Sequence, residues 1–512
     1  MKIGMRGKHF PIVVIFWLLF LCLPNPACSG HQYADLTILH LNDTHGFILP
    51  QIDKSVDMKT PVGGAAYLAF MIEEQRAANP KGTLLLSSGD MFQGTPISNV
   101  FRGKPILDIM NYLRFDAMAL GNHEFDWGQK TLIDLASDAQ FPFLSANLFG
   151  LNGRTPAWLK PYVILRRSGL RIAVIGITTP ETSYTTKPDN VRGLIFTDPD
   201  GILPGLIRQV RKDADLIILL THLGLDDDKA LAAKVSGIDA IVGGHSHTAI
   251  NKPVMVNNTI IVQAKCYGQY LGILKLKIDS ASKKIISFNH RGILKKTLSG
   301  PDESFDPEVA CMVDKYNDLI KGEFSKVIGE TRTDLFRNPR GESNLGNLVC
   351  DAMREAAGSQ IAFQNSGGIR ANIPQGKITL EQVFTVLPFD NDIIGMDLTG
   401  EQIRAILEQN VSREYGILQV SGLKVVYDPN RSIGFRVVEA KVGDHILDPA
   451  KVYRVAINDF LASGGDRFNL FKQGRNVVYA GAVRDAFKDY LKAHSPVHPE
   501  LEGRITYLNE SN

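Results

Sequence analysis

Cysteine is scarce in this sequence, and neither sign of charge is in excess. Five cysteines occur among 512 residues, without any Cys-x-x-Cys pair. A disulfide framework and a thiolate metal site are therefore excluded, although one pair among Cys266, Cys311 and Cys350 could still form a bridge. The 56 basic and 54 acidic residues leave a net charge of +2. This balance predicts neither a nucleic-acid polymer nor an anionic membrane surface as the main partner.

Long apolar runs are absent beyond the N-terminal segment, so no transmembrane anchor is expected there. That segment has three early basic residues, the apolar run 12–23 and the small residues of Ala27-Cys28-Ser29. The pattern predicts a secretory signal peptide over residues 1–29, and with it export to the periplasm or cell envelope. A membrane anchor is disfavoured because about 12 apolar residues are fewer than the roughly 20 that span a bilayer. Lipoprotein anchoring at Cys28 is a weaker alternative, since Asn25 stands where an aliphatic residue is expected.

Length and periodicity predict an N-terminal α/β domain over residues 35–300. A chain of 512 residues holds two or three domains of the usual size, about 100–200 residues each. Short apolar runs typical of buried strands alternate with helical stretches, which indicates a layered α/β structure. The expected strands cover residues 36–41, 83–86, 116–120, 171–177, 215–220 and 239–242, with a helix over 64–78 and a closing strand over 272–278.

A second, smaller α/β domain is expected over residues 327–510. Apolar residues at helical spacing predict an amphipathic helix over 306–321, inside a linker at 304–325. Further elements are expected as helices at 344–357 and 401–409 and as strands at 360–364, 423–427 and 451–457. Thr399-Gly400-Glu401-Gln402 has the pattern of a capping box, which favours a helix start at that point.

Residues whose side chains can bind metal come immediately after five of the expected strands. The five motifs are Asp43-Thr44-His45, Gly89-Asp90, Gly121-Asn122-His123-Glu124, Thr221-His222 and Gly243-Gly244-His245-Ser246-His247. Open α/β sheets bind ligands at the carboxyl ends of their strands. Carboxylate, imidazole and amide groups suit Zn²⁺, Mn²⁺ or Co²⁺. An isolated histidine more often completes a hydrogen bond in a core, but five such motifs at five strand ends argue for a metal site.

The number of candidate ligands predicts two ions and a reaction at phosphorus. Seven ligands are too many for one tetrahedral ion but suit a pair, and Asp90 would be shared by both. Paired ions activate a hydroxide for in-line attack and stabilise the oxygens of the phosphoryl group. The sequence therefore predicts a metal-dependent phosphoester hydrolase.

The five motifs resemble, in order and spacing, those of the calcineurin-like metallophosphoesterases. Residues 122–126 and the second half resemble the secreted 5′-nucleotidase family, which includes bacterial UDP-sugar hydrolases. The resemblance implies a calcineurin-like layered α/β/β/α domain, a linker helix and a smaller C-terminal substrate-recognition domain. One divalent ion would be held by Asp43, His45, Asp90 and His247, and the other by Asp90, Asn122, His222 and His245. Position 247 often carries Gln or Asn in that family, so His247 is a departure.

The same resemblance implies that His123 is the catalytic histidine and that Asp126 orients it. A nearby carboxylate fixes the tautomer of a histidine and favours its charged form, which suits a group that protonates a leaving oxygen.

Two glycine-rich turns in the second half indicate a ligand site. They are Asn365-Ser366-Gly367-Gly368-Ile369-Arg370 and Asn458-Asp459-Phe460-Leu461-Ala462-Ser463-Gly464-Gly465-Asp466. Arg370 offers a planar fork for phosphate, Phe460 a flat face for a base and Asp466 acceptors for ribose hydroxyls. Tight-turn geometry alone is the alternative explanation. The resemblance implies that Asn365, Arg370, Phe460 and Asp466 all touch a nucleotide.

Three positions depart from the family pattern. Arg467 replaces a glycine, and Ile417 stands where a second aromatic should face the base, with Tyr415 two residues earlier. The family also has a phosphate-binding arginine upstream of these turns, and the nearest arginines in this sequence are Arg337 and Arg340.

Nucleoside 5′-phosphates, and also UDP-sugars, are the expected small-molecule substrates. The alternatives are a 2′,3′-cyclic nucleotide 2′-phosphodiesterase/3′-nucleotidase, a non-nucleotide phosphatase, which Ile417 favours, and a non-catalytic surface binding protein, which the complete ligand set disfavours. A monomer and a dimer are equally compatible with the sequence.

Overall fold

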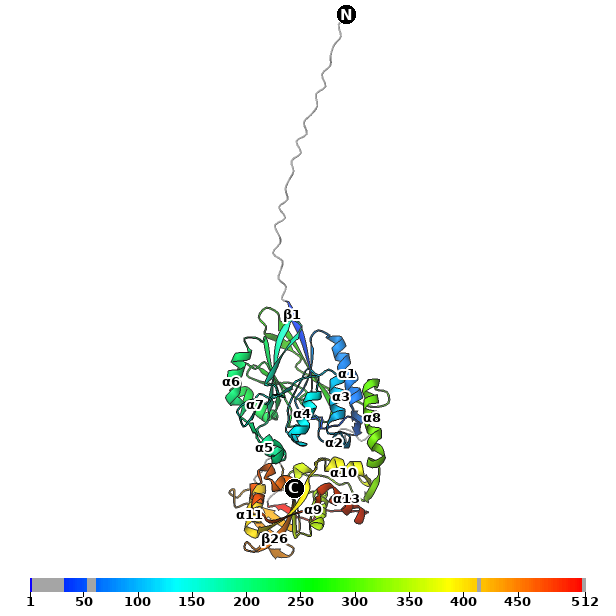
Figure 1. Cartoon of the computed structure of the whole chain (residues 1–512), viewed down its shortest axis with the longest axis vertical. Coiled ribbons are helices and arrows are strands. Elements are labelled where there is room, and N and C mark those ends of the chain that lie inside the picture. Colours follow the sequence, from blue (N-terminus) through cyan, green and yellow to red (C-terminus); the bar gives the residue numbers. More distant parts are fainter. Residues whose placement is uncertain (2–31, 53–60, 412–415, 509–512) are drawn as a thin grey trace.

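The computed structural model describes residues 1, 32–52, 61–411 and 416–508. The expected signal peptide and Tyr415 lie outside these residues. Figure 1 shows two domains arranged along the long axis, with helix α8 (Pro307–Phe324) beside both of them. Within the described ranges, no helix has the length and apolar character needed to cross a bilayer.

The N-terminal domain contains two sheets. The first is formed by β1 (Tyr33–Leu41), β4 (Thr83–Ser87), β5 (Ala117–Ala119), β6 (Phe143–Leu144), β15 (Tyr270–Asp279), β16 (Ile285–Phe288) and β17 (Leu294–Lys296). The second is formed by β8 (Tyr162–Arg167), β9 (Leu170–Thr178), β11 (Leu216–His222), β12 (Ala240–Val242), β13 (Val254–Val256) and β14 (Thr259–Val262). The strand order is β16-β15-β1-β4-β5-β6 in the first sheet, where β17 also pairs with β15, and β13-β14-β12-β11-β9-β8 in the second.

The two sheets pack face to face and helices cover their outer faces. Apolar side chains of both sheets, such as Ile38, Leu84, Val174 and Ile218, form one buried cluster between them. Figure 1 shows α6 and α7 on one side of the strands and α1 and α3 on the other. These helices are α1 (Ala65–Ala78), α3 (Lys104–Tyr112), α6 (Pro199–Val210) and α7 (Leu225–Lys234). The layering is the α/β/β/α arrangement expected from the sequence.

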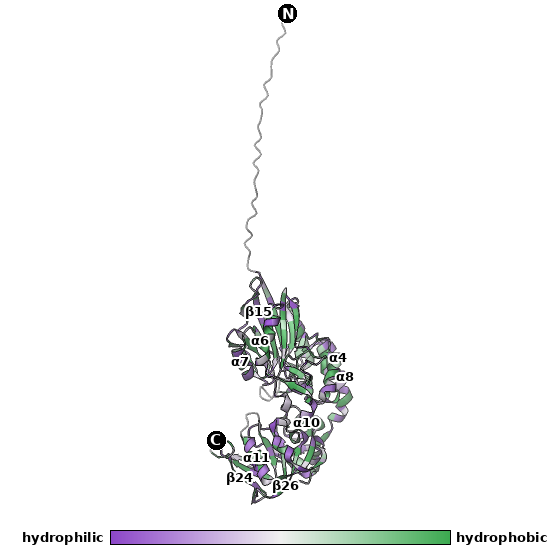
Figure 2. Cartoon of the chain, turned by 60° about the vertical axis from the view of Figure 1, so that its left-hand side comes forward, coloured by the Kyte–Doolittle hydropathy of each residue, from purple (hydrophilic) through white to green (hydrophobic). Residues whose placement is uncertain are grey.

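Parallel pairing brings the ends of the central strands together. β1, β4, β5 and β6 are mutually parallel, as are β9, β11, β12 and β14. Strands covered on both faces are apolar throughout, and accordingly every residue of β11 is buried. Figure 2 shows hydrophobic strands running through the interior of both domains. Each expected strand of this domain occurs within three residues of its predicted bounds, but β11 continues through His222, which the sequence placed after the strand.

Helix α8 leads from the first domain to the second. The side chain of Asp306 accepts hydrogen bonds from the backbone N–H groups of Glu308 and Val309, which caps the start of the helix. Val309, Val313, Ile320 and Phe324 are buried in the same apolar cluster as residues of α1 and α3. The helix ends at Phe324, three residues later than predicted, because this last apolar residue also packs.

The C-terminal domain is built on a sheet with the order β22-β19-β26-β21-β27. Its strands are β19 (Ile361–Asn365), β21 (Asp392–Thr399), β22 (Leu418–Ser421), β26 (Val452–Asn458) and β27 (Arg475–Ala482). One face packs against α9 (Asn344–Ala356), α10 (Leu380–Val386) and α13 (Val483–Ala493), and the other against α11 (Gly400–Val411) and the small sheet that includes β23 (Leu423–Tyr427). The expected capping box is present, since Gln402 N donates to Thr399 Oγ1 at 3.2 Å and Thr399 N donates to Gln402 Oε1 at 2.8 Å. Cys266, Cys311 and Cys350 are free thiols.

Candidate active site

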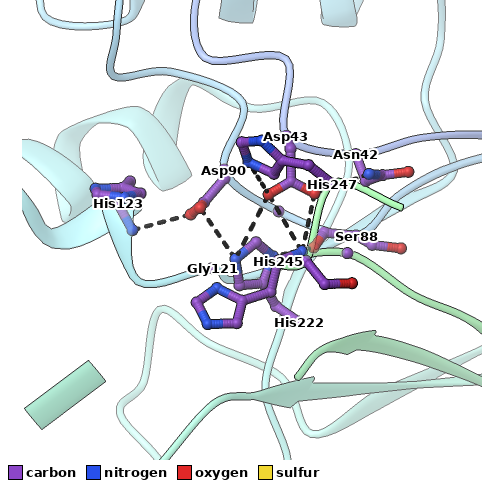
Figure 3. Close-up of polar contacts among 12 residues, drawn as sticks. Asn42, Asp43, Ser88, Asp90, Gly121, His123, His222, His245 and His247 are labelled. Carbon is purple, nitrogen blue, oxygen red and sulfur yellow. Dashed lines mark hydrogen bonds and ion pairs between the residues drawn. The ribbon is translucent and has the colours of Figure 1, made fainter. Parts of the chain in front are cut away.

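The five sequence motifs meet at the carboxyl ends of β1, β4, β5, β11 and β12. Two groups of possible metal ligands result, one of Asp43, His45 and His247 and one of Asp90, His222 and His245. Within each group the ligand atoms lie within 4.8 Å of one another. Asp90 Oδ2 is 3.0 Å from His222 Nε2 and 3.8 Å from His45 Nε2, so this carboxylate lies between the groups (Figure 3). This position would suit a ligand shared by two ions.

Hydrogen bonds turn the ligand atoms toward the centre of the site. His222 Nδ1 lies 2.7 Å from the carbonyl of Ser88, and His45 Nδ1 lies 2.9 Å from the carbonyl of Gln93. A carbonyl only accepts, so Nδ1 carries the hydrogen in both rings and Nε2 is the atom available to a metal. Asn122 Oδ1 is buried and has no hydrogen-bond partner among the described residues. A buried acceptor is costly when unsatisfied, and a divalent ion would satisfy it. The residues present therefore fit a pair of ions.

The backbone is strained at most of these ligands. Asp43, His45, Asp90, His245 and His247 have φ between 49° and 75°, the left-handed region. Each such residue costs of order 1–3 kcal/mol, and strain of this kind concentrates at functional sites. Close packing adds a second constraint, because a Cβ atom at Gly121 would lie 2.1 Å from Asp90 Oδ1. Only glycine fits beside the carboxylate of Asp90.

Neighbouring charges keep the carboxylates ionised despite their burial. Burial alone would raise the pKa of Asp43, but His247 and His222 together outweigh burial and hold that pKa at about 2. Burial likewise opposes ionisation of Asp90, yet His222 holds its pKa well below the usual value. In return, Asp90 raises the pKa of His222 to about 9 against the effect of burial. Both aspartates thus carry the charge that a metal ligand needs.

His123 belongs to neither ligand group, although its backbone N donates to Asp90 Oδ1 at 2.9 Å (Figure 3). It begins the short helix η1 (His123–Phe125), and its Nδ1 lies 2.7 Å from Asp126 Oδ2. Burial lowers the pKa of His123, but the negative charges of Asp126 and Asp90 raise it by more than burial lowers it. The net shift of this pKa is therefore upward. A protonated imidazole held by a carboxylate is suited to give a proton to a leaving oxygen.

Glu124 holds the ligand loops together, a role that the sequence did not reveal. Its Oε2 accepts from Asp90 N at 2.8 Å and Gly121 N at 2.7 Å, and its Oε1 accepts from Met91 N at 2.8 Å. Burial and the charge of Asp90 raise the pKa of Glu124 to about 7. One carboxylate therefore joins the loops after β4 and β5. An acidic residue beside Asn122 and His123 is the one signal in the sequence that hints at it.

Glu124→Gln is expected to loosen this site. A carboxamide has one acceptor oxygen and would turn an N–H₂ group toward a backbone N–H, leaving a buried donor unsatisfied at about 1–3 kcal/mol. We expect a lower unfolding midpoint and weaker metal retention, measured by thermal denaturation and by metal analysis after dialysis. Glu342→Gln is the matched control, since Glu342 accepts from the backbone of Glu502 and Arg504 in the other domain. Equal metal loss in both variants would contradict the role of Glu124.

A cleft of about 640 Å³ opens beside these residues, between the two domains. The N-terminal domain contributes Asn122, His123, Asp126 and His245, and the C-terminal domain contributes Asn365, Arg370, Phe460 and Asp466. Phe389 also lines it, with its ring stacked on His123 at a centroid distance of 5.6 Å. Nothing in the local sequence marks Phe389, because the contact joins positions on different domains.

The recognition residues of the second domain are connected to one another. Asn365 Nδ2 donates to Asp466 Oδ2 at 3.0 Å, and Asn458 Nδ2 donates to Asn365 Oδ1 at 2.8 Å. The ring of Phe460 lies on Gly465, where a Cβ atom would be 2.5 Å from it. This contact explains the second glycine of the motif. The two glycine-rich turns therefore form one surface.

Two positions discussed above lie away from the cleft lining. Arg340 is exposed, and Ile417 is buried in the core of its domain. Arg337 is better placed, because its Nη1 donates to the carbonyl of Arg370 at 3.0 Å. Spacing along the sequence did not show which of the two arginines, Arg337 or Arg340, contacts Arg370.

Comparison with known proteins identifies the family. The profile of the calcineurin-like phosphoesterases matches residues 36–249, and that of the 5′-nucleotidase C-terminal domain matches residues 324–473. The venom 5′-nucleotidase of Crotalus adamanteus is 32% identical over an alignment covering 97% of this chain and 92% of its own. The chain belongs to the 5′-nucleotidase family.

Two further comparisons support this assignment to the 5′-nucleotidase family. The crystal structure of a 5′-nucleotidase precursor from Thermus thermophilus has a TM-score of 0.85 and 36% identity, covering 93% of this chain and 100% of that one. The trifunctional nucleotide phosphoesterase protein YfkN of Bacillus subtilis is 33% identical over 94% of this chain, which spans 35% of that relative's length. As the sequence predicted, the protein is a metal-dependent phosphoester hydrolase with the two-domain α/β architecture.

Proposed function

We propose that the protein releases phosphate from nucleoside 5′-phosphates bound between its two domains. The observation that carries this proposal is the shared cleft, in which His123 and the proposed metal ligands Asn122 and His245 face Asn365, Arg370, Phe460 and Asp466. One ion would be held by Asp43, His45, Asp90 and His247, and a second by Asp90, Asn122, His222 and His245. The donors are oxygen and imidazole without thiolate, which suits Zn²⁺, Mn²⁺ or Co²⁺.

Each side chain has a distinct task in this reaction. Bound ions supply Lewis acidity at the phosphoryl oxygens and activate the attacking water. Arg370 holds the phosphate with its planar guanidinium, and Arg337, which donates to the carbonyl of Arg370, is the candidate for a second cation near it. The charge of Arg370 also acts on the proposed metal ligand His45. Burial lowers the pKa of His45, Asp90 opposes this shift, and Arg370 lowers the pKa further. His123, fixed through Nδ1 by Asp126, gives a proton to the leaving 5′-oxygen.

Phe460 and Asp466 would recognise the nucleoside. The exposed part of the Phe460 ring offers a stacking face for the base, and Asp466 accepts hydrogen bonds from ribose hydroxyls. UDP-sugars and cyclic nucleotides are second candidates. The burial of Ile417 leaves Phe460 as the one aromatic face predicted for the base, which favours the remaining alternative, a phosphatase acting on a non-nucleotide ester. The expectation of export to the periplasm or cell envelope rests on the pattern of residues 1–29 and is part of the proposal.

A substrate panel tests the proposal. The full-length protein would be assayed with Mn²⁺, Zn²⁺ and Co²⁺ against AMP, UDP-glucose, 2′,3′-cyclic AMP and p-nitrophenyl phosphate. The expected result is the highest kcat/KM for AMP. Equal or better use of p-nitrophenyl phosphate would contradict nucleotide recognition, whereas a preference for the cyclic nucleotide would favour the phosphodiesterase alternative.

Phe460→Ala is expected to reduce nucleotide selectivity. Stacking of a base on an aromatic ring contributes about 1–3 kcal/mol, so the ratio of kcat/KM for AMP to that for p-nitrophenyl phosphate should fall by roughly tenfold or more. Steady-state kinetics with both substrates measure this ratio. Phe435→Ala is the control, because Phe435 is an exposed phenylalanine of the same domain. An unchanged ratio in Phe460→Ala would show that this ring does not meet the base.

A further inference from the structure

Residues 181–187 of the N-terminal domain touch both recognition loops of the C-terminal domain. This segment contains the short helix α5 (Thr182–Thr185), which Figure 1 shows at the boundary with the second domain. Lys187 Nζ lies 2.5 Å from the carboxylate of Asp459, the residue before Phe460. The guanidinium carbon of Arg467, the residue after Asp466, lies 4.1 Å from the ring centroid of Tyr184. The segment thus contacts the neighbours of both proposed nucleoside-binding residues.

The contact at Arg467 is a connected set of charged and polar groups. Arg467 Nη2 donates to the hydroxyl of Tyr184 and lies 3.8 Å from Glu181 Oε1, to which the same hydroxyl donates. Arg467 and Asp466 have φ of 59° and 50°, so two successive residues adopt the left-handed conformation. Strain of this kind persists where surrounding contacts over-determine it. The backbone of this loop is therefore held in a shape that directs Arg467 toward the first domain.

The same segment reaches the catalytic pair on its inner side. Thr186 is buried, and its Oγ1 donates to Asp126 Oδ1 at 2.8 Å, while Asp126 Oδ2 faces His123 Nδ1. Thr186 has extended backbone angles, φ −112° and ψ 171°. Successive side chains of extended backbone point to opposite sides, which is why Thr186 reaches inward and Lys187 outward. Movement of Lys187 with Asp459 would displace Thr186 from Asp126.

We propose that residues 181–187 couple docking of the nucleoside-recognition loops to the alignment of His123 by Asp126. The proposal rests on the function proposed above. Thr186 is a positioning residue that acts through Asp126, and Arg467 and Lys187 are the groups through which the second domain acts on it. A nucleoside held by Phe460 and Asp466 keeps these loops against the segment. A small ester lacks that part and gains nothing from the coupling.

A double-mutant cycle on the full-length protein loaded with Mn²⁺ tests this coupling. Thr186→Val removes the hydroxyl and keeps the shape, so kcat for AMP should fall about tenfold, on the scale of an outer-shell hydrogen bond, while KM changes less than about twofold. Thr186→Ser retains the hydroxyl and should restore most of kcat. Arg467→Gln should lower kcat and raise KM for AMP. In the double variant Thr186→Val/Arg467→Gln, kcat should be no lower than in Thr186→Val alone, because both changes break one pathway.

Leaving-group chemistry provides an independent readout. The 5′-alkoxide of a nucleoside needs a proton to leave, whereas p-nitrophenolate is a far better leaving group. Thr186→Val should therefore lower kcat less for p-nitrophenyl phosphate than for AMP. Arg192→Gln is the matched control, since Arg192 pairs with Asp189 inside the first domain, and it should keep the kinetics of the unaltered protein.

Four outcomes would overturn the proposal. Multiplicative losses in the double variant would show that Thr186 and Arg467 act separately. A Thr186→Ser variant as slow as Thr186→Val would exclude the hydroxyl, and a slow Arg192→Gln variant would indicate general loosening of the loop. If the unaltered protein shows no preference for AMP over p-nitrophenyl phosphate, the proposed function fails and this inference with it. A retained preference with a multiplicative cycle would remove the coupling alone.

Discussion

Asp90→Asn should reduce turnover of every phosphoester substrate to background. Asp90 lies between the two ligand groups, and its Oδ2 is the atom that faces both His45 and His222. Outer-shell substitutions at metal sites commonly cost 10–100-fold, so loss of a shared ligand should cost more than about 10²-fold. The asparagine can still accept the hydrogen bond that His123 N donates to Oδ1, which preserves the local backbone. Initial rates of phosphate release at saturating metal measure the effect.

A folding control separates loss of chemistry from loss of structure. Asp116→Asn removes a partly buried aspartate of the same domain that pairs with Arg167 and accepts from Leu85 N, at the opposite end of β5 from Asn122. This variant should lower the unfolding midpoint yet keep kcat near that of the unaltered protein. Ordinary turnover by Asp90→Asn in metal-replete buffer would contradict the assignment of two ions.

His123→Ala should lower kcat for AMP by roughly 10²–10⁴ while leaving the bound metal unchanged. The histidine lies outside both ligand groups, and its Nδ1 is occupied by Asp126. Its loss therefore removes a proton donor and no ligand. The drop should be smaller for p-nitrophenyl phosphate, whose leaving group needs no proton. Steady-state kinetics and metal analysis of the same preparations provide both quantities.

Metal content decides between the two roles open to His123. Asp126→Asn should give a smaller loss in kcat than His123→Ala, because it keeps the imidazole but weakens its orientation. Loss of bound metal in His123→Ala, but not in Asp126→Asn, would place His123 among the ligands and contradict its role as acid.

The sequence was informative where one local pattern decides the structure. Strands buried on both faces have continuous apolar runs, so β4 and β11 were recognised from composition alone, and their parallel pairing explains why ligands from distant motifs meet. The end of β11 was misplaced because Thr221 and His222 are polar but pair with β9 as regular strand residues. Polarity there indicates the site and does not indicate the end of the strand.

Contacts between the domains were beyond the reach of the sequence. Phe389 on His123, and Arg467 on Tyr184, join positions whose separation along the chain carries no periodic signal. The choice between Arg337 and Arg340 depended on which side chain reaches Arg370, a question of loop geometry. The proposed metal ligands could be predicted because they occur in ordered motifs. Glu124 supports them through three backbone hydrogen bonds and Thr186 through one hydrogen bond to Asp126, contacts that no motif predicts.

The most direct test of the central claim is a metal titration followed by AMP hydrolysis. Protein stripped of metal would be titrated with Mn²⁺, with bound metal and the rate of adenosine and phosphate formation measured at each step. The two-ion account predicts that activity appears as the second ion binds and reaches its plateau at two ions per chain. Full AMP hydrolysis with one ion per chain, or in the absence of bound metal, would contradict it.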